Sequence, residues 1–497
     1  MNPKNTEFNK FRSFFWPIHK HELIKFVPML FLFFFVAFNY HLLRIVKDTL
    51  IITAPKGGAE TLPFLKVWCI LPFAIFMTFL FTKLSNKFNR EKIFYMFISI
   101  FLIFYLIFII FLYPKRDVLA LNRTADYLTS ILPKGFNGFV AIIRYWCYSL
   151  FYIMAECWST IVVSVLLWGF ANDTIKVPEA KRFYALFGLG INSAGIFAGQ
   201  TVSLITKKNI NLVSNKYFQS SWDNTLLIII SIILIFGVIS MIIHRWLHKN
   251  IFQNRQYSNE QKDYKMSLKK NITFIFKSRY LLSIALIVLS YNVIINLTEI
   301  LWKSQLRELF PTPQQYTSYM SKITILIGIL ASISSYFVSG NVIRRLGWGK
   351  AAMITPLIII LTAIGFFSFL FSKQFLSSFS IFGMSSLTLC VFFGSTQNIF
   401  SRACKYTLFD DTKEIAFIPL STKDKIKGKS AIDGIGSRLG KSGSSFIIQL
   451  LLMMFITPAA CSPVIAVLIL IIIPIWISSI SVINKNFQTT QSKIETI

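Results

Sequence analysis

Apolar runs of about 20 residues recur along the whole chain, with shorter polar segments between them. The runs Ile93–Tyr113, Leu226–Ile243 and Met353–Phe371 are typical. A helix of that length crosses about 30 Å of hydrocarbon. The runs lack the alternation of polar and apolar residues that the strands of a membrane barrel show. The pattern therefore predicts an all-α membrane protein with about twelve transmembrane helices.

The first run, Leu23–Leu43, is too long for the core of a signal peptide, and no small-x-small cleavage site follows it. We therefore expect it to be retained as the first span, without a presequence. The predicted spans are 23–43, 63–83, 92–113, 139–171, 181–205, 225–243, 280–301, 319–342, 350–371, 377–408, 430–456 and 462–484.

The charge is strongly basic: 51 Lys and Arg against 21 Asp and Glu give a formal net charge of +30. Most of the basic residues lie in short connections, above all in 244–279 and 402–429, and cytoplasmic loops are enriched in Lys and Arg. This predicts a multi-pass protein with both termini in the cytoplasm and hence an even number of spans. The orientation of the loops in the lipid bilayer explains most of the basic excess, so no nucleic acid polymer is expected as a partner. The remainder can serve an anionic substrate.

The basic connection also divides the chain into an N-terminal half, 1–243, a cytoplasmic linker, 244–279, and a C-terminal half, 280–497. The halves are weakly alike, since 87–92 parallels 345–350 and 181–190 parallels 427–436. Two six-helix halves in the same orientation are the plan of major-facilitator-like carriers. In these the substrate lies between the halves, near the middle of the membrane.

Charged residues within spans are the best functional candidates, because each costs about 2.5–3.5 kcal/mol at the centre of a membrane helix. Lys47 follows the first span, where it could instead extend to the lipid headgroups. Glu156 lies in the middle of the fourth span, and its structural alternative is an ion pair with Arg144 or with a Lys of another helix. Glu299 lies near the end of the seventh span, where Lys303 offers an ordinary i,i+4 pair.

Four cations surround the eleventh span. Lys427 and Lys429 could be ordinary loop charges, whereas Arg438 and Lys441 lie deeper and need an anion or a carboxylate as partner.

Enzymatic signatures are missing from the sequence. Gly440-Lys441-Ser442 fails the phosphate-loop spacing, because position 435 is Ile, and no metalloprotease, nucleophile-elbow or dinucleotide motif occurs. The six Cys are scattered without a C-x-x-C pair or a His cluster. We therefore expect a protein that is not an enzyme, with no metal site and no cofactor.

Five segments resemble the nucleotide transporters of obligate intracellular bacteria and plastids, the ATP/ADP translocases. They are RIVKDTLIITA (44–54), FYIMAECWSTIVVSVLLWGFAN (151–172), EAKRFYALFG (179–188), INLTEILWKSQLRELFPT (295–312) and KIKGKSAIDGIGSRLGKSG (425–443). The resemblance implies exchange of host ATP for ADP across the bacterial inner membrane, with both nucleotides as substrates. It also implies key charges at Lys47, Glu156, Glu299 and Lys427. Two positions depart from the family pattern: Cys157 replaces a usual Leu, and Asp173 a usual Gln.

A polyphosphate carries several negative charges, so its binding requires several charge-assisted hydrogen bonds from cations. We expect Lys47, Lys427 and either Arg438 or Lys441 to bind phosphate, and Glu156 and Glu299 to pair with these cations in the empty carrier. One alternative is a carrier of GTP, CTP or UTP, with or without proton coupling. A multi-span enzyme or scaffold would need a soluble active site or a reactive cluster, and the sequence shows neither.

Overall fold

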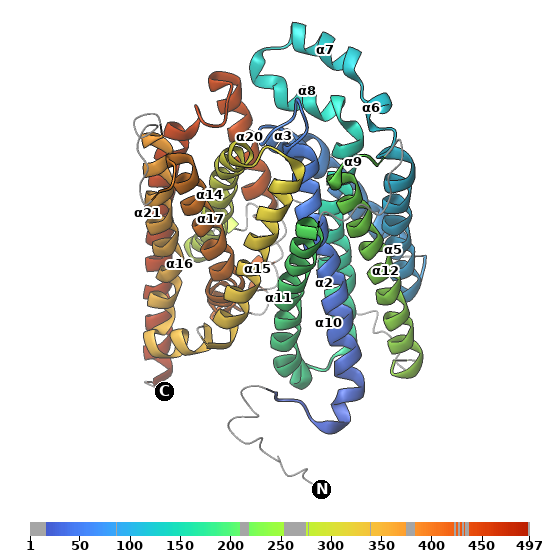
Figure 1. Cartoon of the computed structure of the whole chain (residues 1–497). Helices are drawn as coiled ribbons and strands as arrows, with labels where there is room; N and C mark the ends of the chain where they lie inside the picture. Colours follow the sequence, from blue (N-terminus) through green and yellow to red (C-terminus); the bar gives the residue numbers. More distant parts are fainter. Residues whose placement is uncertain are drawn as a thin grey trace.

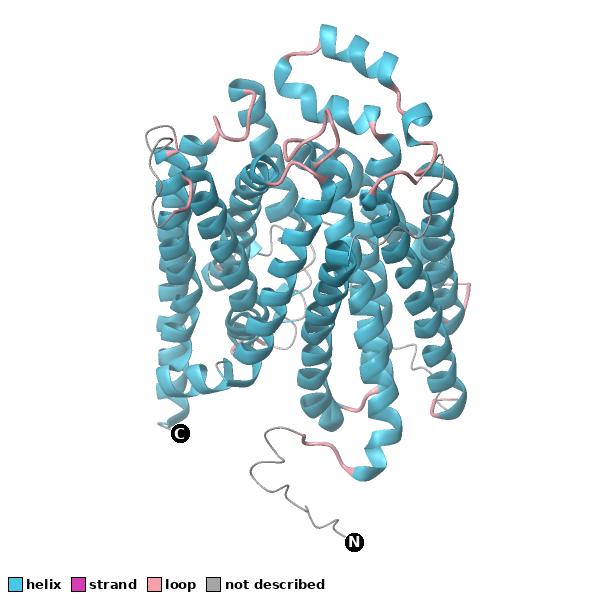
Figure 2. Ribbon diagram, viewed as in Figure 1, coloured by secondary structure: helices cyan, strands magenta, loops and turns pink. Residues whose placement is uncertain are grey.

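The computed structural model describes residues 16–85, 87–208, 218–252, 275–276, 278–337, 339–373, 383–421, 424–425, 428–429, 432 and 437–495. The described chain is built from helices, many of which run along one common direction (Figures 1 and 2). Helix α2 begins and helix α21 ends at the same end of the molecule (Figure 1). This arrangement is consistent with an even number of crossings. We call that end the terminal end.

The earlier part of the chain contains long helices and shorter α, 3₁₀ and π-helical pieces. They are η1 Lys20–Glu22, α2 Leu23–Ile52, α3 Thr61–Phe64, η2 Leu65–Ile70, α4 Leu71–Ser85, α5 Arg90–Ile107, η3 Phe108–Leu112, α6 Arg116–Leu119, α7 Asn122–Ile131, η4 Lys134–Phe136, α8 Asn137–Arg144, α9 Trp146–Cys157, η5 Trp158–Leu167, α10 Trp168–Thr174, α11 Val177–Lys208 and α12 Ser221–Asn250.

The later part is also built from long helices, with fewer short helical pieces between them among the described residues. Its helices are α14 Arg279–Leu309, α15 Pro313–Phe337, α16 Ser339–Ser372, α17 Ser386–Cys404, η6 Lys405–Phe409, α18 Asp410–Ala416, α20 Ser437–Phe455 and α21 Ser462–Glu495. Gly347 interrupts α16 with φ 76°, a left-handed conformation that glycine adopts without a steric penalty. The kink falls where the sequence predicts the connection between the spans 319–342 and 350–371.

The predicted class, an all-α membrane protein, is confirmed. Among the described residues, ten helices are long and apolar enough to cross a membrane. They are Lys20–Ile52, Thr61–Ser85, Arg90–Leu112, Trp146–Thr174, Arg182–Lys208, Ser221–Asn250, Arg279–Leu309, Pro313–Ser335, Asn341–Ser372 and Ser462–Asn486. The remaining two predicted spans, 377–408 and 430–456, coincide with α17 and α20, which are not among these ten. The total of twelve therefore stays a prediction.

The fourth span begins later than the sequence predicts. The expected helix over 139–171 is broken at Tyr145 (φ −108°, ψ 48°), so α8 ends at Arg144 and α9 starts at Trp146. The break is held by polar contacts: the Arg144 guanidinium donates to Asp126 at 2.5 Å, and Trp146 Nε1 donates to the Leu119 carbonyl at 2.8 Å. Residues 116–144 thus form a helical cap at the end opposite the terminal end (Figure 1). We call this the cap end.

Close packing joins the earlier helices to the later ones. Helix α11 lies against α15 and crosses it at two glycines. A Cβ on Gly199 would lie 2.7 Å from the Ser321 carbonyl oxygen, and one on Gly328 would lie 2.8 Å from that of Asn192. The missing side chains therefore allow the two backbones to approach closely, as small residues do between membrane helices.

Candidate functional site

The last two turns of α2 carry the first charges of the site. Helix α2 runs unbroken to Ile52, so Lys47 and Asp48 lie inside the bundle and not at a frayed helix end. Lys47 is 6% exposed and Asp48 is 2% exposed. The interpretation that Lys47 extends to the lipid headgroups is therefore wrong.

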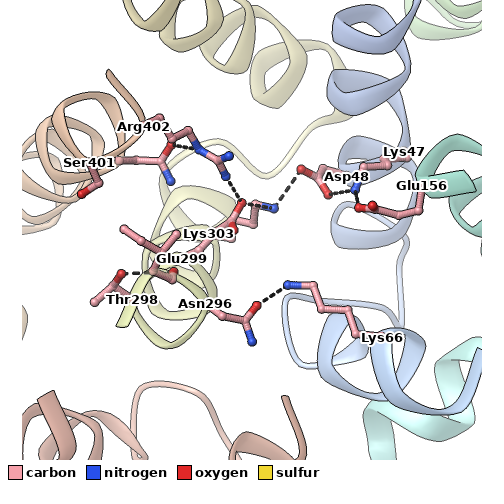
Figure 3. A network of polar contacts seen from close by, with 12 residues as sticks. Lys47, Asp48, Lys66, Glu156, Asn296, Thr298, Glu299, Lys303, Ser401 and Arg402 are labelled. Atoms are coloured by element: carbon pink, nitrogen blue, oxygen red, sulfur yellow. Dashed lines mark hydrogen bonds and ion pairs between the residues drawn. The ribbon is translucent and has the colours of Figure 1, made fainter. Parts of the chain in front are cut away.

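These two residues belong to a continuous series of ion pairs, which we call the ionic chain (Figure 3). Lys47 Nζ lies 2.5 Å from Glu156 Oε1 and 3.5 Å from Asp48 Oδ1. Lys303 Nζ lies 2.8 Å from Asp48 Oδ2 and 2.9 Å from Glu299 Oε1. The same oxygen of Glu299 accepts from the Arg402 guanidinium at 2.9 Å. The members in order are Glu156, Lys47, Asp48, Lys303, Glu299 and Arg402.

Four helices supply the ionic chain. Glu156 comes from α9, one turn after Tyr152, whose ring centre lies 3.9 Å from the Lys47 ammonium. Such a cation–π contact adds to the ion pair. Glu299 and Lys303 share one face of α14 by their i,i+4 spacing, and Arg402 comes from the end of α17. The Asp48–Lys303 pair links residues 255 positions apart in the sequence.

One side of the ionic chain is accessible to solvent. The Glu156 side chain is 33% exposed although it lies well inside a membrane span, whereas that of its partner Lys47 is 7% exposed. Lys441 of α20 is also exposed, and its charge acts on Glu156. A carboxylate of one helix and an ammonium of another therefore share a polar, water-accessible region between α9 and α20.

The described charges in this region are predominantly positive. Three carboxylates, Asp48, Glu156 and Glu299, interact with six cations, Arg44, Lys47, Lys66, Lys303, Arg402 and Lys441. Lys405 also lies nearby but pairs with Asp410 at 3.0 Å. Since several of these charges are buried and uncompensated charge at membrane depth is costly, this excess favours an anionic ligand.

Residues 1–487 match the family model described as TLC ATP/ADP transporter.

This chain belongs to the TLC ATP/ADP transporter family.

The predicted family is confirmed, and membership places the chain among transporters and not among enzymes. It is 40% identical over 489 residues to ADP,ATP carrier protein 1 of Chlamydia pneumoniae, covering 97% of this chain and 94% of that protein. It is 38% identical over 474 residues to the chloroplastic ADP,ATP carrier protein 1 of Arabidopsis thaliana, covering 95% of this chain and 75% of that protein.

Solved structures confirm the major-facilitator-like fold. A bacterial homologue of the iron transporter ferroportin, in its inward-facing state, matches with a TM-score of 0.55 and 14% identity, covering 94% of this chain and 98% of that one. A D-xylose–proton symporter matches with a TM-score of 0.50 and 12% identity, covering 93% and 97%. At this level of identity the likeness concerns the fold alone.

The structure of this family member brings Lys47, Glu156 and Glu299 into one ionic chain. Of the two alternative partners of Glu156, Arg144 is wrong because it pairs with Asp126 in the cap, whereas a Lys of another helix is confirmed, since Lys47 comes from α2. The Glu299–Lys303 pair exists, but Lys303 also bridges to Asp48. Lys427 lies outside the described residues, as does the side chain of Arg438.

Sequence reasoning missed four polar residues at or beside the ionic chain: Asp48 as the bridge, Arg402, Lys66, and Asn296, which accepts a hydrogen bond from the Lys66 ammonium. Arg402 was counted among the basic residues of a loop, although it lies within the predicted span 377–408. Lys66 is the fourth residue of the predicted span 63–83, so the cost of an intramembrane charge would have singled it out. The role of Asp48 had no local signal, because its partner Lys303 is remote in the sequence.

The departure at Asp173 does not add a carboxylate to the ionic chain. Its side chain pairs with Arg90 at the start of α5. The extra charge therefore ties α10 to α5. Among the described residues, no group of three or more His, Cys, Asp or Glu side chains could hold a metal ion.

Proposed function

We propose that this chain exchanges ATP for ADP across the bacterial inner membrane, with host ATP moving inward and both termini in the cytoplasm. The observation that carries the proposal is the ionic chain, which joins early and late helices of an ATP/ADP transporter family member, together with the further cations around it. The Chlamydia and plastid relatives named as ADP,ATP carriers support the choice of nucleotide.

The phosphate chain of the nucleotide carries about three to four negative charges and needs several cationic donors. We assign this role to Lys47 and Lys441, together with Lys427 and Arg438. Glu156 and Glu299 hold neighbouring cations while no nucleotide is bound, as the 2.5 Å Glu156–Lys47 contact illustrates. A phosphate oxygen replaces a carboxylate as the partner of Lys47 when the substrate enters.

Contacts between early and late helices close the cap end. Besides Asp48–Lys303, the hydroxyls of Thr49 and Thr317 lie 2.9 Å apart, and the Arg307 guanidinium donates to the Ala54 carbonyl at 3.1 Å. Opening this end requires these contacts to break. A substrate favours that step only if it binds the rearranged state more tightly. Without substrate these contacts stay formed, so the empty carrier rarely reorients and exchange is obligatory.

We further propose that 1–243 and 280–497 move as two units on either side of the linker 244–279. The contacts of Asp48 with Lys303 and of Gly199 with Ser321 then lie between the units. Alternating access in transporters of this architecture is largely a rigid-body movement of one bundle against the other.

The deciding experiment is counterflow in liposomes that contain the purified full-length protein. Labelled ATP should accumulate when the liposomes hold ADP and remain near background when they are empty. Undiminished uptake into empty liposomes would contradict exchange. Unlabelled GTP, CTP and UTP serve as competitors, and each should displace labelled ATP far less than ADP does.

A further inference from the structure

Lys66 is a cation beside the ionic chain that differs from the cations of the chain in its partner. It lies in η2, a π-helical stretch between α3 and α4, and π-helical turns occur frequently at functional sites. Its charge acts on, and is acted on by, Glu156, Lys47, Glu299 and Lys303, so it lies within the same electrostatic region. In Figure 3 its ammonium points from η2 towards Asn296 of α14.

The partner of Lys66 is neutral. Its ammonium donates to the side-chain oxygen of Asn296, and it makes no ion pair with a described carboxylate. Lys47, Lys303 and Arg402 each have a carboxylate partner within 3 Å. No described carboxylate therefore competes for the Lys66 ammonium, and an incoming anion need displace only a neutral partner.

Asn296 is held in the one orientation that presents its oxygen to Lys66. Its amide nitrogen donates to Ser444 Oγ at 2.7 Å and to Ser445 Oγ at 2.9 Å. The Ser444 hydroxyl donates to the Gly440 carbonyl at 2.6 Å, and the Ser445 hydroxyl donates to the Lys441 carbonyl at 2.8 Å. Both hydroxyls therefore act as acceptors towards Asn296. An ammonium only donates, which fixes the amide oxygen towards Lys66.

The same contacts bring Lys66 close to the helix of Lys441. Asn296 lies between η2 and α20, and two further bonds join α20 to η2 and to the helix α3 that precedes it. Trp68 Nε1 of η2 donates to Gln449 Oε1 at 3.0 Å, and Gln449 Nε2 donates to the carbonyl of Pro63 in the adjoining α3 at 2.9 Å. Two cations without a described carboxylate partner within ion-pair distance, one from an early and one from a late helix, thus border the accessible region.

We propose that Lys66 binds the phosphate chain of the nucleotide and that Asn296 is its positioning residue. The proposal rests on the proposed function and adds a ligand that the family resemblance did not indicate. An anion between Lys66 and Lys441 gains a charge-assisted hydrogen bond from each side at the cost of one neutral contact. It also draws η2 and α20 together, which couples binding to the packing of early against late helices.

The competing explanation is that Lys66 only ties η2 to α14. Two substitutions separate the explanations. Lys66→Gln keeps a hydrogen-bond donor for Asn296 but removes the positive charge. Asn296→Asp converts the hydrogen bond into an ion pair, so the Lys66 ammonium then has a carboxylate partner. A structural tie tolerates the first change and keeps its bond to Lys66 in the second, where the Ser444 and Ser445 hydroxyls must turn to donate to the new carboxylate. A phosphate-binding role is lost in both and retained in Lys66→Arg.

The test measures binding of ATP, ADP and adenosine to the purified full-length protein by calorimetry, with thermal unfolding as a check of folding. Lys66→Gln and Asn296→Asp should each weaken binding of ATP and ADP by about tenfold or more, the value of one charge-assisted bond. Any binding of adenosine should be unaffected. Lys56→Gln is the matched control, because the Lys56 side chain is 64% exposed in the cap region.

Affinities for ATP and ADP within twofold of wild type in Asn296→Asp would overturn the proposal, whether or not Lys66→Gln folds. So would an equal loss of adenosine binding. Failure of the wild-type protein to bind either nucleotide would instead contradict the proposed function, so the two failures are distinguishable.

Discussion

Two aspartates of this protein occupy similar positions between cations but very different surroundings. Asp48 in the ionic chain lies 3.5 Å from Lys47 and 2.8 Å from Lys303. Asp126 in the cap lies 3.2 Å from Lys56 and 2.5 Å from Arg144. The Asp126 distances are shorter, yet its side chain is 58% exposed, whereas that of Asp48 is 2% exposed.

The difference shows that distance alone does not rank ion pairs. Water screens the cap pairs and solvates Asp126 when a partner leaves. Asp48 has no such replacement, so breaking its pairs leaves buried charge. Asp48 also joins early to late helices, whereas Asp126 joins segments of the early part alone. The ionic chain can therefore stabilise one arrangement of early against late helices, whereas the cap pairs only stabilise the surface structure of the cap.

The largest effect is expected for Asp48→Asn. It should lower the free energy of unfolding by about 3 kcal/mol, the lower end of the range for breaking a buried pair, because Lys47 keeps Glu156 and Lys303 keeps Glu299. ATP/ADP exchange should be abolished. Denaturation in detergent and counterflow in liposomes measure the two effects. A cycle with Lys303→Met isolates the coupling, and a variant as stable and active as wild type would remove the contrast with Asp126.

An intermediate effect on stability is expected for Lys47→Ala. Asp48 keeps Lys303, and the freed Glu156 side chain is already 33% exposed, so the protein should still fold. Exchange should fall by about tenfold or more, because a phosphate ligand is lost. Counterflow and a melting curve measure both quantities. Full transport activity would show that Lys47 lies outside the substrate site.

The smallest effect is expected for Asp126→Asn, which should leave exchange unchanged. Hydrogen bonds from Arg144 and then Lys56 lower the pKa of Asp126 below its usual value. Its folded-state pKa is depressed, so its contribution to stability is fully present above the unfolded-state pKa, about 3.9, and is lost as the pH falls through the lower folded-state pKa. Melting curves of both proteins should therefore differ slightly at pH 7 and converge once the pH falls below the folded-state pKa of Asp126. A loss of exchange would make the cap part of the transport mechanism.

The sequence by itself determined the properties that depend on neighbouring residues. Apolar length decided the membrane class, because a span must cross a fixed thickness of hydrocarbon. The cost of intramembrane charge singled out Glu156 and Glu299. The motif residues around Lys47 indicated the family, which the comparisons confirmed.

Only the tertiary structure decided which charges meet. Lys303 is a local partner of Glu299 by helical spacing, but its contact with Asp48 depends on how the early and late helices pack together. The break at Tyr145 likewise depends on Arg144 reaching Asp126 in the cap. Hydrophobic length is a local property that a run of residues carries, whereas an ion pair between distant residues exists only after the helices have packed. The sequence could therefore name candidate charges without showing how they are joined.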